Sequence, residues 1–191
     1  MKRSLLAGAC ALALLVSPVA ANEFEAPLKE LANSEIIAIA AAPEVIAAVK
    51  AQNAETAGYD QATIDAADAT WREEVSASSS PMIDAVLARP ASSFLAAKKD
   101  GSSGLYTEIF VMDAKGLNVA QSDVTSDYWQ GDEAKWQETY GKGADSLHLS
   151  DVELDESSQT YQSQVSVPVV DENGDVIGAL TVGVNVEYLM M

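Results

Sequence analysis

Alternating apolar residues near the C-terminal end form the clearest pattern along the chain. In residues 176–187 the apolar positions on one side are Val176, Leu180, Val182, Val184 and Val186. Residues 159–170 are rich in β-branched side chains and precede the sequence Asp-Glu-Asn-Gly-Asp at 171–175. A period of two is typical of a half-buried strand, and Asn-Gly is typical of a tight turn because both residues tolerate positive φ. The pattern predicts a long antiparallel hairpin, with Pro168 at an edge or a bulge because proline cannot donate to the ladder.

The N-terminal part of the chain has a helical period instead. Apolar residues recur there at helical spacing, Pro43, Pro81 and Pro90 suit first helical positions, and Asp60 suits an N-cap. Four or five helices are expected, over residues 25–42, 43–53, 60–75, 81–87 and 90–99. After Gly104 the period changes from that of a helix to that of a strand.

The second part of the chain reads as strands with one inserted helix. Strands are expected at 105–112, 117–122 and 148–154, followed by the two strands of the hairpin. A polar, aromatic loop at 123–131 and a short helix at 132–140 separate the second strand from the third. Helices followed by a run of strands indicate the α+β class. We therefore predict N-terminal helices packed on a five-stranded antiparallel sheet.

The first residues predict an export signal. Lys2 and Arg3 form a basic start, residues 5–16 form a short apolar core, and small residues follow Pro18. This order predicts a signal peptide over residues 1–21, cleaved after Ala21, with an uncleaved anchor as the alternative. The expected location of the mature chain, residues 22–191, is therefore the periplasm.

Charge and cysteine content narrow the functional classes. The 11 basic residues include Lys2 and Arg3, so the mature chain has 9 basic residues against 29 acidic ones, a net charge of −20. So acidic a chain is a poor partner for nucleic acid or anionic lipid, because both are polyanions. Cys10 is the single cysteine, so the mature chain must be stabilised by its core rather than by disulfides.

The order of elements resembles the extracytoplasmic Cache sensor domains of the single-module type. The resemblance covers roughly residues 33–187, and its motifs are Glu-Ile-Phe-Val-Met-Asp-Ala-Lys-Gly at 108–116, Ala-Gln-Ser at 120–122, Asp-Tyr-Trp-Gln-Gly-Asp-Glu-Ala-Lys-Trp at 127–136 and Val-Pro-Val-Val-Asp-Glu-Asn-Gly-Asp-Val-Ile-Gly-Ala-Leu-Thr-Val at 167–182. It implies one Cache-like domain over 22–191, with a helical part at 22–104 and a PAS-like sheet at 105–191. It also implies a small-molecule pocket between the sheet and the crossing loop and helix.

The chain departs from the family in two respects. Such domains usually lie between two membrane helices of a larger receptor, and no second apolar segment of spanning length and no output domain are expected here. The arginine that precedes Trp-Tyr in the amino-acid-binding signature of the family is absent before Asp127-Tyr128-Trp129. The resemblance further implies that a homodimer can form through the N-terminal helices.

Candidate ligand contacts come from the aromatic loop and from the sheet. In the loop and helix these are Tyr128, Trp129, Asp132 and Trp136, because aromatic walls with a few polar groups suit a small molecule. The alternatives are that Trp136 packs with Tyr140 as the buried face of the helix and that Asp132 caps it. On the sheet the candidates are Tyr106, Tyr161 and Ser163, with Tyr106 expected to share a face with Glu108. The acidic residues near the aromatic rings favour a cationic or zwitterionic ligand.

Catalysis is not expected, and neither is a cofactor or a metal. A Ser–His–Asp arrangement would need His148, the single histidine, and no Gly-x-Ser-x-Gly motif accompanies any serine. The acidic turn at 171–175 has the first carboxylates of a calcium loop but lacks its glycine and closing glutamate. The sequence therefore predicts a soluble periplasmic sensor module that binds a small molecule and acts through a membrane sensor or transporter. The alternative is a non-catalytic protein-interaction module whose pocket is filled by side chains.

Overall fold

The computed structural model describes residues 23–155 and 159–189. The predicted signal peptide, residues 1–21, lies outside the described residues. The helical part consists of α1 (Glu25–Leu31), the π-helix η1 (Ala32–Ile36), α2 (Ile37–Ala40), α3 (Pro43–Thr56), α4 (Gln61–Val75), α5 (Pro81–Leu87) and α6 (Pro90–Gly101). The remaining helices are the short α7 (Ala134–Gln137) and α8 (Val186–Leu189).

The predicted helix starts are confirmed. Proline occupies the first position of α3, α5 and α6, where its missing N–H needs no partner. The Asp60 carboxylate accepts the Thr63 N–H at 2.9 Å and so caps α4. The expected first helix, 25–42, is observed as α1, η1 and α2 in succession, with a π-helical turn in the middle.

The strands form one antiparallel sheet with the order β2-β1-β6-β5-β3, in which β4 also pairs with β5. The strands are β1 (Tyr106–Met112), β2 (Asn118–Gln121), β3 (His148–Leu149), β4 (Glu153–Asp155), β5 (Thr160–Val170) and β6 (Val176–Asn185). The central pair, β5 and β6, is the hairpin predicted from the alternating runs, and Gly174 takes a φ of +86° in its turn. Pro168 lies beyond the pairing with β3, which involves only Val165 and Ser166, so it faces no partner strand of the described chain on that side.

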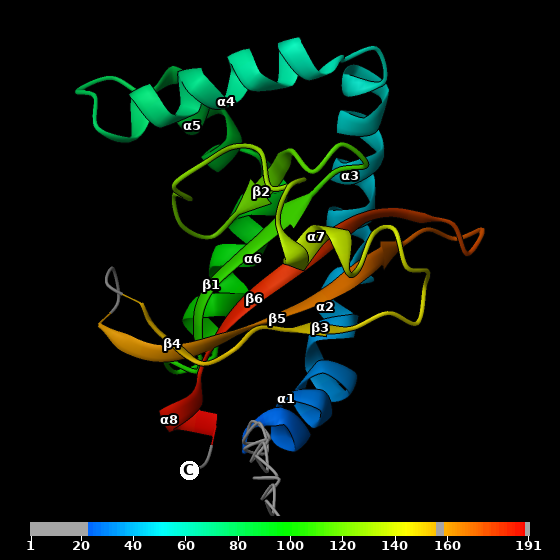
Figure 1. Cartoon of the computed structure of the whole chain (residues 1–191), viewed down its shortest axis with the longest axis vertical. Coiled ribbons are helices and arrows are strands. Elements are labelled where there is room, and N and C mark those ends of the chain that lie inside the picture. Colours follow the sequence, from blue (N-terminus) through cyan, green and yellow to red (C-terminus); the bar gives the residue numbers. More distant parts are fainter. Residues whose placement is uncertain (1–22, 156–158, 190–191) are drawn as a thin grey trace, which may run out of the picture.

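The two faces of the sheet are covered differently. Helices α2, α3 and α6 lie behind the sheet in Figure 1, α1 lies below it, and α7 with its neighbouring loops lies in front. The main core fills the helical side and includes Ile36, Val45, Leu95, Ile109 and Leu180. α4 and α5 extend past the β2 end of the sheet, at the top of Figure 1, and have a smaller core around Trp71. The predicted fold class, helices packed on an antiparallel sheet, is therefore confirmed.

Two elements differ from the prediction. The expected strand at 148–154 is divided into β3 and β4, so the described sheet has six strands rather than five. The expected helix at 132–140 is reduced to Ala134–Gln137, followed by turns up to the glycines at 141 and 143. Glycine favours turns over helices because its backbone is the least restricted, which explains the early end.

Among the described residues, no single helix is long and apolar enough to cross a membrane. The helices Glu25–Ala40 and Pro43–Thr56, bent by 61° at the break between them, would be long and apolar enough as a pair.

Candidate ligand-binding site

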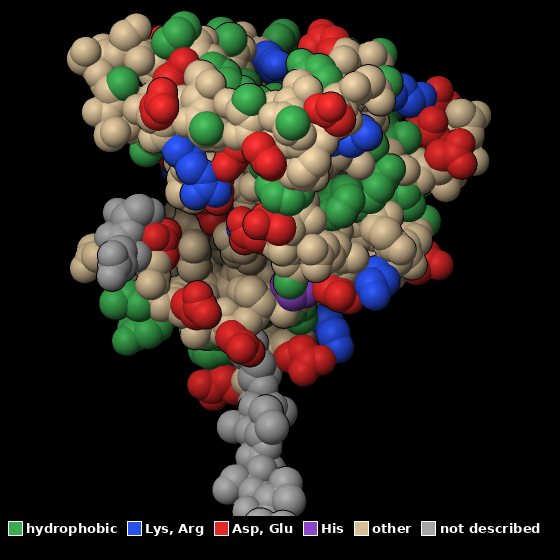
Figure 2. Space-filling view, turned by 45° about the horizontal axis from the view of Figure 1, so that its top comes forward, with side chains coloured by type: hydrophobic (Ala, Val, Ile, Leu, Met, Phe, Trp, Pro, Cys, Tyr) green, Lys and Arg blue, Asp and Glu red, His purple; other side chains and the backbone are tan. Residues whose placement is uncertain are grey.

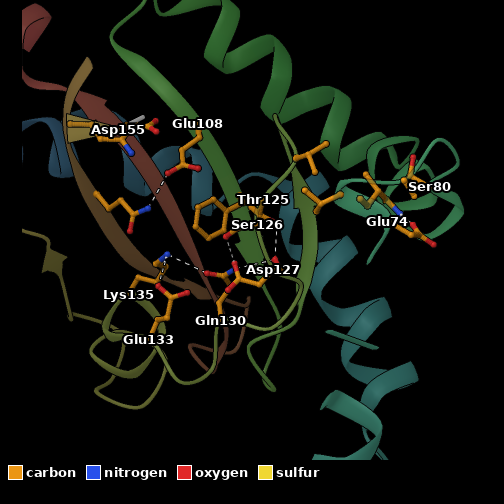
Figure 3. Close-up of a pocket in the computed structure, with 17 residues that line it drawn as sticks. Glu74, Ser80, Glu108, Thr125, Ser126, Asp127, Gln130, Glu133, Lys135 and Asp155 are labelled. Carbon is orange, nitrogen blue, oxygen red and sulfur yellow. Dashed lines mark hydrogen bonds and ion pairs between the residues drawn. The ribbon is translucent and has the colours of Figure 1, made fainter. Parts of the chain in front are cut away.

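A cavity of about 660 Å³ lies on the side of the sheet that faces away from the main core. Its walls come from the end of α4 and the start of α5, from β1, β4 and β5, and from the segment between β2 and α7 (Figure 3). Its lining includes the charged residues Glu74, Glu108, Asp127, Glu133 and Lys135 and the aromatic residue Phe110. A volume of this size is in the range of small-molecule sites.

The floor of the cavity is built around a glycine. Gly183 of β6 pairs with Glu108 of β1 on one side and with Gln164 of β5 on the other. Because Gly183 has no side chain, the two longer side chains meet above it, and the Gln164 amide donates to the Glu108 carboxylate at 2.9 Å. A Cβ at Gly183 would come within 2.8 Å of the Glu108 Cγ. The glycine therefore keeps a carboxylate and an amide in place at the base of the cavity.

The aromatic residues explain why only part of this sheet face is hollow. Trp136 packs against Phe110, Met112 and Ala179 and covers one half of the face. Its indole N–H donates to the Asp113 carbonyl at 3.0 Å, and its ring stacks on Tyr140 with the centroids 4.9 Å apart. The other half, from Phe110 toward Glu108, remains open as the cavity.

The loop that roofs the cavity is fastened to α4. The Asp68 carboxylate accepts the backbone N–H groups of Tyr128 and Trp129, both at 2.9 Å. One turn later the Trp71 indole donates to the Thr125 carbonyl at 2.9 Å, and its ring stacks on Tyr128 at 5.3 Å. Arg72 bridges Asp68 at 2.6 Å and Asp127 of the loop at 3.0 Å. One face of α4 therefore holds the loop at three successive points.

The far side of the same loop rests on the turn between β1 and β2. The backbone of Gly131 lies so close to Gly116 that a Cβ at Gly116 would be 2.5 Å from the Gly131 Cα. Gly116 also has a φ of +81°, a conformation that residues with a Cβ rarely adopt. The Trp129 indole closes this contact by donating to the Lys115 carbonyl at 2.9 Å.

Most carboxylates that line the cavity have positively polarised partners. Asp127 is paired with Arg72, and Glu133 is paired with Lys135 at 2.8 Å. Glu74 accepts the backbone N–H groups of Met82 and Ile83 at 2.8 and 3.0 Å. Lys135, whose side chain is only 12% exposed, also lies over the Phe110 ring at 5.3 Å.

Glu108 differs from these carboxylates. Its one hydrogen-bond partner in the described chain is the neutral amide of Gln164, and it has no ion-pair partner there. Burial raises the pKa of Glu108, and the nearby Asp155 and Asp123 act in the same direction, although Gln164 and Lys135 oppose them. Glu108 therefore lacks the ion pair that Asp127 and Glu133 have and the two backbone N–H donors that Glu74 has.

The mouth of the cavity carries exposed apolar side chains. Val75 of α4 is 47% exposed and Val124 of the loop is 48% exposed, and both line the cavity. Outside it, the face shown in Figure 2 has many acidic side chains and fewer basic ones, in line with the formal net charge of −18. The site thus combines an acidic surrounding, an apolar rim and a polar floor.

The structure places the predicted loop residues around the cavity rather than in its lining. Tyr128 is buried against Trp71, and burial raises the pKa of Tyr128 to about 12. Trp129 and Trp136 donate their indole N–H groups to backbone carbonyls, as described above, and Asp132 is exposed. Asp132 does not cap α7, since the N-cap position belongs to Glu133.

The predicted sheet residues lie on the helical side of the sheet. Tyr106 is buried in the main core and donates its hydroxyl to Glu35 at 2.7 Å. Ser163 is buried and donates to the Ser150 carbonyl at 2.8 Å, and Tyr161 is 52% exposed. The expectation that Tyr106 and Glu108 share a face is wrong, because a shift in the pairing with β6 between these two residues turns them to opposite sides. Ligand contact by the seven predicted residues stays a prediction.

Sequence reasoning located the segment but missed the residues that line the cavity. The loop and helix at 123–140 were selected for their aromatic rings, whereas Asp127, Gln130, Glu133 and Lys135 of the same segment face the hollow. The sequence did contain a pattern that marks the floor of the cavity. Gln162 and Gln164 are polar residues at alternate positions before an apolar run, so they point to the same side of their strand. Glu108, the partner of Gln164, could not be placed beside it without the strand order.

The described residues contain no group of three or more histidine, cysteine, aspartate or glutamate side chains arranged to hold a metal ion. His148 lies on β3, and burial lowers its pKa.

Comparison with known proteins gave matches only among solved structures. No family model matches the chain, and no curated protein matches it. The chain is similar to sensor domains of bacterial receptors and kinases. One is the ligand-binding domain of the Campylobacter jejuni chemoreceptor Tlp3 in complex with 4-methylisoleucine, with 14% identity and a TM-score of 0.41 over 87% of this chain. Another is the E. coli DcuS sensor domain, with 13% identity and a TM-score of 0.46 over 87% of this chain and 96% of that chain.

A third match is the sensor domain of the V. cholerae histidine kinase DctB, with 16% identity and a TM-score of 0.39 over 87% of this chain. This chain spans 61% of the length of the Tlp3 domain and 58% of the DctB domain. Because all three TM-scores lie below 0.5, no ligand and no partner of this chain follows from them.

Proposed function

We propose that this protein is a sensor module that binds a small molecule reversibly in the cavity between the sheet and the loop at 123–135. The observation that carries the proposal is the open hollow of about 660 Å³ over Phe110, with a polar floor and a roof that α4 holds in place. Tertiary contacts thus keep open a space that side chains could have filled. The proposed role is recognition without catalysis, and the acidic lining favours a cationic or zwitterionic ligand.

The proposal extends to where and how the module acts. The predicted signal peptide supports export to the periplasm, with the single domain of residues 22–191 as the mature protein. Binding would then be reported to a membrane sensor or transporter, with a homodimer through the N-terminal helices as the proposed assembly. Mass determination of the exported protein tests the cleavage site, and light scattering of the purified protein tests the dimer.

The binding proposal is tested by thermal unfolding of the purified protein with a panel of amines, zwitterions, carboxylates and neutral sugars. A ligand at a hundredfold excess over its Kd stabilises the folded state by about 2.7 kcal/mol. For a chain of this length that is a rise in Tm of roughly 5–11 °C. Ala77 lies at the exposed edge of the cavity, so Ala77→Trp narrows the entrance and should abolish the shift.

Ala57→Trp is the matched control, since Ala57 is an exposed residue just after α3, outside the cavity lining. A shift that persists in Ala77→Trp would place binding elsewhere. If no class of compound shifts the Tm, the alternative of a protein-interaction module is favoured.

A further inference from the structure

Three of the carboxylates that line the cavity have a cation or two backbone N–H donors beside them. Asp127 faces Arg72, Glu133 faces Lys135, and Glu74 caps two backbone N–H groups. Glu108 faces a neutral amide instead. An ionised carboxylate that is partly withdrawn from water and forms no ion pair is costly for a folded protein. A positively charged ligand group would remove this cost.

We propose that the ligand is an organic cation with a hydrocarbon portion, whose ammonium group is held by the Glu108 carboxylate and the Gln164 amide oxygen. The inference rests on the proposed function, because it assigns a ligand class to the same cavity.

The floor of the cavity has two side-chain oxygens that can accept hydrogen bonds from an ammonium group. The Gln164 Nε2 donates to one oxygen of Glu108, and no contact within the described chain occupies the other Glu108 oxygen or the Gln164 amide oxygen. Neither oxygen is sealed from the cavity space, since the fully buried side-chain atoms without a partner belong to other residues. An ammonium group carries N–H donors and no acceptor, so it fits this pair of oxygens.

The opposite side of the cavity suits the hydrocarbon portion. Phe110 lies between Glu108 and the loop, with the Lys135 ammonium 5.3 Å from its ring centroid, and contributes apolar surface to the lining. Val75, Val124 and Ile83 continue the apolar surface toward the mouth (Figure 3 shows the lining residues). A small ammonium ion without a carbon chain would leave these side chains uncovered.

A buried amide lies behind the lining of the cavity. Gln121 is only 1% exposed, and its amide nitrogen has no hydrogen-bond partner among the residues that the structure describes. Gln121 pairs with Phe110 across the strands, so both side chains lie on the cavity face, and its amide oxygen lies 3.4 Å from Thr125 of the lining. This nitrogen is fully buried and Gln121 does not line the cavity, so the proposed ligand contacts are those of Glu108 and Gln164.

Binding of a cation should be linked to the protonation of Glu108. Burial raises the pKa of Glu108 in the ligand-free protein. Asp155 of β4 and Asp123 of the loop after β2 raise this pKa further, whereas Lys135 of α7 lowers it. A cation beside the carboxylate lowers that pKa again. The proton that leaves Glu108 passes to the buffer, so affinity should increase as the pH rises through the raised pKa.

The experiment compares ligands of equal size and different charge. Calorimetry and thermal unfolding are run on the purified protein with a series of primary alkylamines from propylamine to hexylamine, each beside the alcohol and the carboxylate of the same chain length. We expect the amines to bind, with affinity rising along the series, and the alcohols and carboxylates to bind at least about tenfold more weakly.

The variant Glu108→Gln keeps the size of the side chain and removes its charge. It should weaken amine binding about tenfold or more and abolish its pH dependence between pH 4.5 and 7.5. Glu153→Gln is the matched control, because Glu153 is an exposed residue of β4 outside the cavity lining. Calorimetry of the original chain in two buffers of different ionisation enthalpy should show proton release, which a merely structural role of Glu108 would not produce.

The binding results distinguish a wrong ligand class from a wrong proposed function. If carboxylates or neutral compounds bind in the cavity and amines do not, the ligand class is overturned and the binding module remains. Equal amine affinity in Glu108→Gln, or no binding by any amine of the series, also overturns the inference. No binding by any class in the wider panel overturns the proposed function as well.

Discussion

Replacing Asp68 by alanine should destabilise the protein and loosen the roof of the cavity. Asp68 lies on α4, and one of its oxygens accepts the backbone N–H groups of Tyr128 and Trp129 at 2.9 Å each, while the other pairs with Arg72. In Asp68→Ala both N–H groups lose their partner in a partly buried position. No other contact of α4 reaches these two groups.

The size of the effect follows from those two bonds. Hydrogen bonds to charged groups contribute about 1.5–3 kcal/mol each. Because water can reach the partly buried N–H groups after the loop loosens, we expect a total loss near the lower end, about 2–4 kcal/mol. For a chain of this length the Tm should fall by roughly 4–16 °C, since each kcal/mol corresponds to about 2–4 °C.

Asp65→Ala is the matched control, because it makes the same substitution on the same helix. Asp65 is exposed and accepts one hydrogen bond, from Gln61 one turn earlier at 2.7 Å. Such a pair contributes about 0.2–0.5 kcal/mol. The change in helix propensity is shared by the two variants and cancels in their difference.

The assay is urea unfolding of the three proteins, together with hydrogen exchange of the backbone amides of Tyr128 and Trp129. Exchange at both amides should become faster in Asp68→Ala and stay unchanged in Asp65→Ala. The reasoning is refuted if the two variants differ by less than about 0.5 kcal/mol, the usual error of additivity between sites. Unchanged exchange at the two amides would refute it as well.

Three further predictions concern the glycine contact, the stacked tryptophan and the buried carboxylate. Gly116→Ala should lower the free energy of unfolding in urea by at least about 1 kcal/mol more than Gly174→Ala does. Both glycines have positive φ, for which a side chain costs roughly 1–2 kcal/mol. Only at Gly116 would a Cβ also meet the backbone of Gly131. Equal losses would show that the close approach has no energetic weight. Trp71→Phe should cost about 1–3 kcal/mol by leaving a loop carbonyl without its donor, and a loss below about 0.5 kcal/mol would contradict this. Because burial raises the pKa of Glu108 in the folded state, ionisation of its carboxyl costs stability as the pH rises through that pKa. Glu108→Gln should therefore raise the Tm of the ligand-free protein at pH 7 relative to the original chain, with the difference shrinking toward pH 4, and a pH-independent difference would contradict the assignment.

The local signals that the sequence carries are those that depend on neighbours along the chain. Proline at the starts of α3, α5 and α6, the Asp60 cap and the Asn-Gly turn each act within a few residues, so they could be read without coordinates. The alternation in β6 likewise fixed which side of the hairpin faces the core, because the period of a strand is set by backbone geometry. These signals determined the fold class and the position of the loop at 123–140.

The tertiary structure alone decided which residues face the cavity. The shift in pairing after Tyr106 turns this residue to the helical side and Glu108 to the cavity side, which alternation alone predicts wrongly. The meeting of Glu108 and Gln164 depends on Gly183, a residue between them in the sheet but distant from Glu108 in sequence. Tyr128 stacks on Trp71 of α4 and the Trp129 indole donates to the Lys115 carbonyl, two long-range contacts that hold the loop and that the sequence pattern did not predict. A sequence pattern fixes the direction of a side chain relative to its own strand, whereas the partners of that side chain depend on strand order and packing across the fold.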